Sequence, residues 1–211
     1  MIFKEGFIHA DPHPGNLFVR KTGPGPRDVE LVILDHGIYT ELPKDTRWSY
    51  TKLWRGVLAQ DESLVREASS DLGCDFHQLF ASMVVNRKFE DIMDKSKKSQ
   101  MKTRLGDRDT TEAKQELQEY ALFYHQEIVE ILDMIKRELL LVLKTNNYLR
   151  AIDRRLGNPT NTFNVINEMT WKVYWREVSE DMSLYSMMRE FMRYGFLKVG
   201  LWLMYLRVRL R

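Results

Sequence analysis

Two short segments near the amino end contain the residues whose types and spacing could carry out chemistry. They are residues 9–16, with the letters HADPHPGN, and residues 35–37, with the letters DHG. A carboxylate such as Asp11 can orient an attacking hydroxyl and accept its proton, while Asn16 and Asp35 can supply oxygen ligands for Mg²⁺. The combination supplies the groups that a phosphoryl-transfer site needs, a carboxylate to accept a proton and oxygen ligands for a metal.

Short strands should position these residues. Apolar runs flank the first segment on both sides, which favours a loop held between two short strands. The Gly- and Pro-rich residues 21–28 predict a turn, and the apolar run at 29–34 predicts a buried strand that ends at Asp35. Rigid strands on either side would hold the three oxygen-bearing side chains around one metal.

The remainder of the chain reads as helical. Helices are expected from Leu42 onward, over 61–72 and over 76–86, and one long amphipathic helix is expected over 117–143. Residues 94–114 carry many charges and few apolar anchors, which predicts a solvated insertion. A helical break is expected at Asn158-Pro159, and a last helix from Ser183 to the end. The predicted fold class is therefore mainly α with a short β hairpin.

The composition excludes several partners and structures. The chain has 211 residues with Lys+Arg 32 against Asp+Glu 30, a net charge of +2, so no overall charge favours nucleic acid. The single cysteine, Cys74, cannot form an internal disulfide, and it is expected to be a packed small apolar residue. No apolar run approaches the roughly 20 residues of a spanning helix, and the amino end shows no targeting signal.

The two motifs together resemble the UbiB/aarF family of atypical kinases. Asp11 and Asn16 have the spacing of the protein-kinase catalytic loop, and residues 35–37 stand where Asp-Phe-Gly is usual. The stretch LLLVLKTNNYLRAIDRRLG at 139–157 also resembles this family, in the mitochondrial aarF-domain-containing kinase one/five subgroup. The resemblance implies that residues 1–157 form a kinase-like C-lobe and that 158–211 form a C-terminal helical extension.

The same resemblance implies roles and cofactors. Asp11 would be the catalytic carboxylate, Asn16 and Asp35 the Mg²⁺ ligands, and His13 a contact to the phosphates of ATP. A mitochondrial location and a part in lipid or membrane homeostasis follow from the same likeness. The strand Lys and helix Glu that grip ATP, and the family's Lys-x-Gly-Gln signature, do not precede the loop. The expectation is a C-lobe whose N-lobe is missing and which is inactive as this fragment.

Two other classes of function remain open at this stage. His9, Asp11 and His13 could form a metal triplet of a metallohydrolase, since imidazole and carboxylate suit zinc or iron. Alternatively, the motifs could persist in a non-catalytic, pseudokinase-like interaction module.

The carboxyl-terminal residues 191–211 suggest an additional partner. They contain five basic side chains and no acidic one, with Trp202 and Tyr205 among leucines. That composition is typical of a helix lying on an anionic lipid membrane surface. The alternative is a helix packed on the core, with Leu197, Leu201 and Met204 buried against the 117–143 helix.

Overall fold

The computed structural model describes residues 1–94, 111–157, 161–178, 187–192, 194–196 and 198–200. The strands and one 3-10 turn are β1 (Phe7–His9), η1 (Pro14–Asn16), β2 (Leu17–Lys21), β3 (Val29–Ile33) and β4 (Tyr39–Glu41). The helices are α1 (Lys44–Ala59), α2 (Glu62–Asp71), α3 (His77–Val85), α4 (Phe89–Met93), α6 (Thr111–Phe123), α7 (His125–Met134), α8 (Arg137–Arg155) and α9 (Thr162–Val178). The predicted class, mainly α with a short β hairpin, is confirmed.

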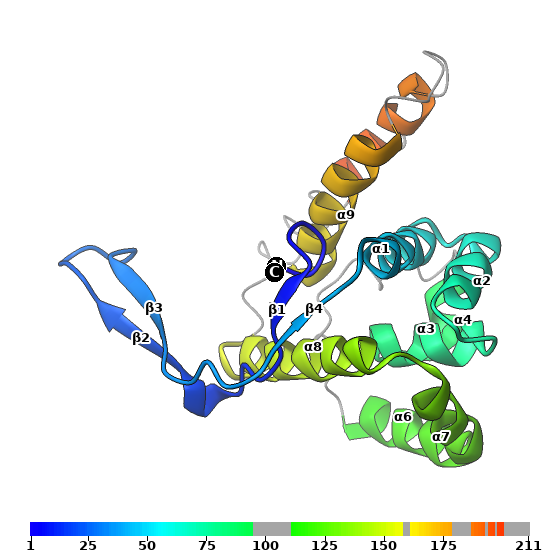
Figure 1. The fold of residues 1–211 in the computed structure, drawn as a ribbon, viewed down its shortest axis with the longest axis horizontal. Coiled ribbons are helices and arrows are strands. Elements are labelled where there is room, and N and C mark those ends of the chain that lie inside the picture. Colours follow the sequence, from blue (N-terminus) through cyan, green and yellow to red (C-terminus); the bar gives the residue numbers. More distant parts are fainter. Residues whose placement is uncertain (95–110, 158–160, 179–186, 193, 197, 201–211) are drawn as a thin grey trace.

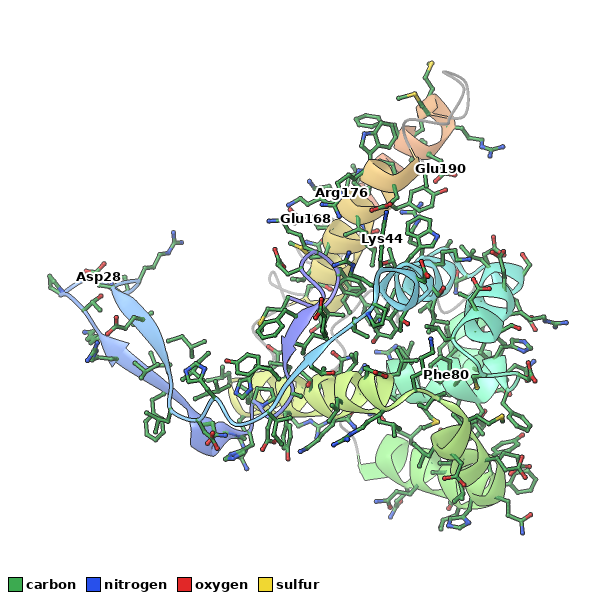
Figure 2. The ribbon with its side chains drawn as sticks, in the orientation of Figure 1. Asp28, Lys44, Phe80, Glu168, Arg176 and Glu190 are labelled. Carbon is green, nitrogen blue, oxygen red and sulfur yellow. The ribbon has the colours of Figure 1, made fainter. Side chains whose placement is uncertain are left out.

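The strands form two nested antiparallel pairs. β1 pairs with β4 in the register Ile8↔Thr40, and β2 pairs with β3 in the register Val19↔Leu31. Figure 1 shows the β2–β3 hairpin extending away from the helical body, and Figure 2 places Asp28 at its tip. The predicted Gly/Pro turn is there, and the Asp28 carboxylate accepts a hydrogen bond from the Gly25 N–H at 2.8 Å.

The prediction that residues 29–34 form a buried strand is wrong on burial. The strand forms, but Leu31 is 63% exposed and its partner Val19 is 70% exposed. The reason is that β3 pairs with β2 outside the body, where none of the described helices covers either face. An apolar run specifies a strand locally, whereas its burial depends on what packs against it.

The helical body is built around α1. Tyr50, Leu53 and Trp54 of this helix are almost completely buried, and α1 packs against both α2 and α9. At Gly56 a side chain would come within 2.9 Å of the Val65 backbone nitrogen, so the missing Cβ permits the close approach of α2. The edge of Trp54 meets Phe163 of α9, with ring centroids 6.4 Å apart.

The single helix predicted over 117–143 is three helices in the structure. Ile135 follows the last residue of α7 and Lys136 precedes the first residue of α8, and both have extended backbone (ψ 147° and 144°). Ile135 is nevertheless only 4% exposed, so the turn itself contributes an apolar residue to the core. The three- and four-residue apolar spacing continues through the turn, which explains why the sequence pattern did not reveal it.

The remaining sequence predictions have mixed outcomes. Helices near 61–72 and 76–86 are confirmed by α2 and α3, and Cys74 is buried as expected. Within the predicted insertion 94–114, residues 95–110 lie outside the described residues, while 111–114 belong to α6 and are not a loop. Asn158-Pro159 lies outside the described residues as well. The described parts of 187–200 are helical, in agreement with the expected last helix.

Candidate active site

The segment that follows β1 is shaped by a short 3-10 turn. His13 caps this turn, because its Nδ1 accepts a hydrogen bond from the Gly15 N–H at 3.0 Å, and Pro14 suits the first position. A side chain at Gly15 would meet the His13 ring at 2.8 Å. The turn positions Asn16, which is 8% exposed and whose Nδ2 donates to the Asp11 carbonyl oxygen at 3.3 Å.

Backbone hydrogen bonds attach the Asp35 segment to this loop at both ends. The Leu34 N–H donates to the Asn16 carbonyl at 3.0 Å, and the Ala10 N–H donates to the Ile38 carbonyl at 2.9 Å. Between them, the Asp35 Oδ1 accepts a hydrogen bond from the Gly37 N–H at 2.7 Å. The two predicted motifs therefore lie side by side, and each of them connects one strand pair to the other.

Asp11 has an unusual polar environment. Its side chain is 24% exposed overall, but Oδ1 is inaccessible to solvent and makes no hydrogen bond. The Lys144 Nζ of α8 lies 3.2 Å from this oxygen, close enough for an ion pair but without hydrogen-bond geometry. The groups predicted to bind Mg²⁺, the Asn16 amide and the Asp35 carboxylate, are oxygen donors of the kind that this hard cation takes. Asn16 uses its Nδ2 as a donor, so its amide oxygen is the atom left for such a cation.

The three histidines near the loop have structural contacts. His9 is 5% exposed, its Nδ1 lies 3.2 Å from the Ile38 carbonyl oxygen, and its ring stacks on Tyr39. The His36 Nδ1 lies 2.6 Å from the Tyr39 hydroxyl. Within the described residues, no three His, Cys, Asp or Glu side chains gather in a way that could hold a metal ion. The metallohydrolase triplet of His9, Asp11 and His13 is therefore wrong.

The α8 helix forms one wall of the site, which the sequence reading did not anticipate. Besides Lys144, its Tyr148 ring lies 6.3 Å from the His13 ring. Asn146 donates to the buried Tyr50 hydroxyl at 2.9 Å, and Arg150 donates to the Val84 carbonyl. These bonds fix α8 against α1 and α3. Residues 139–157, which include most of α8, resemble the aarF family in sequence, but the spacing of their side chains does not indicate which of them reach the loop.

Comparison with known proteins identifies the family. Residues 1–69 match the family model of the ABC1 atypical kinase-like domain. AarF domain-containing kinase 1 of Drosophila melanogaster is 37% identical over 158 residues, which are 74% of this chain and 29% of that protein. An ABC1 protein of Arabidopsis thaliana is 34% identical over 215 residues, 97% of this chain and 39% of that protein. The chain belongs to the ABC1, or aarF, family of atypical kinase-like proteins.

The family relatives are much longer than this chain. AarF domain-containing protein kinase 1 of Mus musculus is 35% identical over 169 residues, 79% of this chain and 30% of that protein. The chain thus spans between 29% and 39% of the length of the relatives named. No solved structure matches the chain. The resemblance to the aarF family stated from the two motifs is confirmed.

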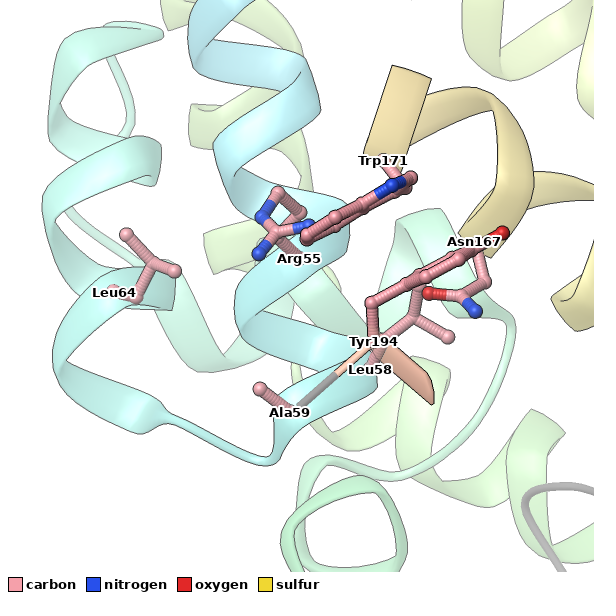
Figure 3. Close-up of a pocket in the computed structure, with 7 residues that line it drawn as sticks. All are labelled: Arg55, Leu58, Ala59, Leu64, Asn167, Trp171 and Tyr194. Atoms are coloured by element: carbon pink, nitrogen blue, oxygen red, sulfur yellow. The ribbon is translucent and has the colours of Figure 1, made fainter. Parts of the chain in front are cut away.

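A cavity in this aarF-family chain lies away from the loop. It has a volume of about 40 Å³ and is bordered by α1, α2, α9 and the helical residues around Tyr194. Figure 3 shows its lining: Arg55, Leu58, Ala59, Leu64, Asn167, Trp171 and Tyr194. A volume of that size holds a water molecule rather than a nucleotide.

The carboxyl-terminal helical residues pack on α9 and α1 with one side. Tyr194 stacks on Trp171 with ring centroids 4.4 Å apart, and Glu190 forms an ion pair with Arg55 at 3.0 Å. Leu197, Leu201 and Met204, which were expected to pack on the 117–143 helix, lie outside the described residues. Among the helices that the structure describes, none is both long and apolar enough to span a membrane.

Proposed function

We propose that the whole aarF-family protein carries out ATP- and Mg²⁺-dependent phosphotransfer or ATP hydrolysis at the loop of Asp11. The observation that supports this proposal is the pairing of the two motifs through the Leu34–Asn16 and Ala10–Ile38 backbone hydrogen bonds. In this arrangement Asp11 orients the attacking hydroxyl or water and accepts its proton. Asn16 and Asp35 would hold Mg²⁺, which neutralises charge on the phosphates.

In protein kinases two lobes supply different parts of the site, and the proposal assigns the parts of this protein in the same way. Residues 1–157 correspond to the C-lobe, and the strand Lys and helix Glu that grip the nucleotide lie elsewhere in the whole protein. A polypeptide of residues 1–211 by itself should therefore turn over no ATP above background. Asp11-dependent turnover by that polypeptide would contradict the proposed role of a separate nucleotide-gripping lobe.

The test uses a longer polypeptide that joins this chain to a nucleotide-gripping lobe. Asp11→Asn and Asp35→Asn should each lower ATP turnover by about 100-fold or more, because they remove the proton acceptor and a metal ligand. Asp28→Asn is the matched control, since Asp28 lies at the exposed tip of the β2–β3 hairpin. If the longer polypeptide binds partners but shows no turnover, the non-catalytic interaction module becomes the better account.

A second proposed function is binding to an anionic lipid surface, as in mitochondrial membranes. One side of the carboxyl-terminal helical residues packs on the body through Glu190 and Tyr194. The other side is apolar and more than half exposed: Met188, Phe191, Met192, Phe196 and Val199. At 100° per residue these five positions fall on one face, with the exposed Arg189 and Lys198 on its two flanks. An apolar face bordered by cations suits an anionic bilayer.

Co-sedimentation with cardiolipin-containing vesicles tests this second function. Each cation near the surface contributes about 1 kcal/mol, which salt screens, so binding should weaken as NaCl rises from about 50 to about 200 mM. The double variant Phe191→Ser with Phe196→Ser should lose binding. Phe18→Ser, on the exposed β2–β3 hairpin, should leave it unchanged. If the double variant binds the vesicles as well as the wild type does, the apolar face does not bind lipid and serves another partner.

A further inference from the structure

We infer that Lys144 of α8 supplies the cation that contacts the transferred phosphate beside Asp11. The inference rests on the proposed phosphotransfer function and adds a phosphate-binding residue to it. The Lys144 Nζ lies 3.2 Å from the Asp11 Oδ1 and 5.5 Å from the centre of the Tyr148 ring. An ammonium group next to the proton acceptor is where a phosphoryl group would arrive during transfer.

The Lys144 ammonium group can contact an incoming ligand while it contacts Asp11. Its side chain is 43% exposed, so the ammonium group faces both the carboxylate and solvent. An ammonium group has three donor hydrogens, and the ion pair with Asp11 occupies at most one of them, so at least two remain available to phosphate oxygens. Asp11 thus holds the Lys144 ammonium group in place without using all of its hydrogen-bond donors.

The loop itself offers a poorer candidate. His13 stands two positions after Asp11, where many protein kinases have a phosphate-contacting lysine. In this chain the His13 Nδ1 accepts a hydrogen bond from the Gly15 N–H and so caps the 3-10 turn. Contact between the same nitrogen and a phosphate would break this cap. The local structure therefore leaves the phosphate contact to another residue.

The helix that carries Lys144 is firmly anchored. Its neighbours Val142 and Thr145 are buried, and Asn146 bonds to the Tyr50 hydroxyl. Arg150 is the next cation along α8, but its guanidinium is held by the Val84 carbonyl. Lys144 therefore extends from a fixed backbone towards the loop. This rigidity suits a group that must meet a phosphate at a defined place.

A purely structural role is the rival explanation, in which Lys144 only holds Asp11 in position. Binding of magnesium tripolyphosphate to residues 1–211, measured by calorimetry, separates the two. Lys144→Met should weaken the affinity by about tenfold or more, and Lys144→Arg by less than about threefold, because a charged donor remains. Lys44→Met is the matched control: Lys44 also pairs with a partly buried carboxylate, its Nζ lying 2.9 Å from the Glu177 Oε2, but this pair joins α1 to α9 and does not involve the loop.

Asp11→Asn supplies the decisive contrast. If Lys144 acts on the phosphate, removing the Asp11 charge should leave tripolyphosphate affinity equal or higher, since a repulsive anion is gone. If Lys144 acts only through Asp11, then Lys144→Met and Asp11→Asn should change the affinity alike. That result would overturn the inference, as would an unchanged affinity for Lys144→Met or a wild-type dissociation constant weaker than about 10 mM.

Failure of this inference differs from failure of the proposed function. If Asp11→Asn abolishes ATP turnover in the longer polypeptide while Lys144→Met alters neither turnover nor affinity, phosphotransfer stands and Lys144 has no phosphate role. If Asp11→Asn leaves turnover intact, phosphotransfer at this loop fails whatever Lys144 does. Thermal unfolding of each variant confirms that the chain is folded, and the exposure of Lys144 predicts small shifts.

Discussion

A partly buried hydrogen bond joins α1 to the helix that carries Lys144, and its removal gives a sharp test of the structure. The Tyr50 side chain is 1% exposed, and its hydroxyl accepts from the Asn146 Nδ2 at 2.9 Å. Tyr50→Phe keeps the ring, which contacts Phe3 and Trp54. It removes only the acceptor and leaves the half-buried Asn146 amide without its partner.

The expected cost can be estimated from burial. An unsatisfied buried donor costs about 1–3 kcal/mol, and since Asn146 is only half-buried we expect about 1–2 kcal/mol. For a chain of this size that corresponds to a fall of about 2–8 °C in the unfolding midpoint. Urea unfolding followed by tryptophan fluorescence measures the free energy directly.

A double-mutant cycle isolates the bond. Tyr50→Phe combined with Asn146→Ala should show a coupling free energy of about 1 kcal/mol, because the two changes remove the same contact. Tyr148→Phe is the matched control on α8 and should change stability by less than about 0.5 kcal/mol. Additive effects of Tyr50→Phe and Asn146→Ala would refute the assigned contact between α1 and α8.

The same tyrosine predicts a dependence on pH. Burial raises the pKa of Tyr50 above its ordinary value of 10.0. The folded protein therefore holds the phenol proton more tightly than the unfolded chain, so this stabilisation is complete below pH 10.0 and is lost as pH rises towards the raised pKa. Wild type should lose stability above that pH more steeply than Tyr50→Phe. Parallel slopes for the two proteins would contradict this.

Three further outcomes are expected. Burial raises the pKa of the Cys74 thiol to about 11. At about pH 8 this thiol should therefore react with a disulfide reagent roughly 100-fold more slowly than the same thiol in the urea-unfolded chain. Equal rates would refute the burial of Cys74. Gly15→Ala should lower ATP turnover in the longer polypeptide, since the new Cβ meets the His13 ring, whereas Gly195→Ala has open space and should not. Leu31→Thr should change the free energy of unfolding by less than about 0.5 kcal/mol in urea titration, because the residue is exposed; a larger loss would place β3 in the core.

The residues of the candidate site could be predicted from sequence where they lie close together in the chain. The strands around Asp11, the turn before Val29 and the position of Asp35 after a strand all follow from local patterns. Lys144 could not be found in this way, because it reaches Asp11 only through the packing of α8, and tertiary packing has no signature in local spacing. The β2–β3 hairpin itself was predicted, but its exposure to solvent was not, since burial of an apolar strand is decided by its neighbours.

The hydrophobic core cluster includes Ile8 and then no residue before Leu42, although residues 9–41 hold Asp11, Asn16 and Asp35. A segment with so few buried apolar side chains opens at a smaller free energy than the helices of the core. Amide hydrogens in β2 and β3 should therefore exchange with solvent faster than those in α1. Asp11, Asn16 and Asp35 therefore lie in a stretch that adds little to the hydrophobic core. If the proposed function holds, mutations in residues 9–41 would abolish the activity and still leave a folded protein available for other uses.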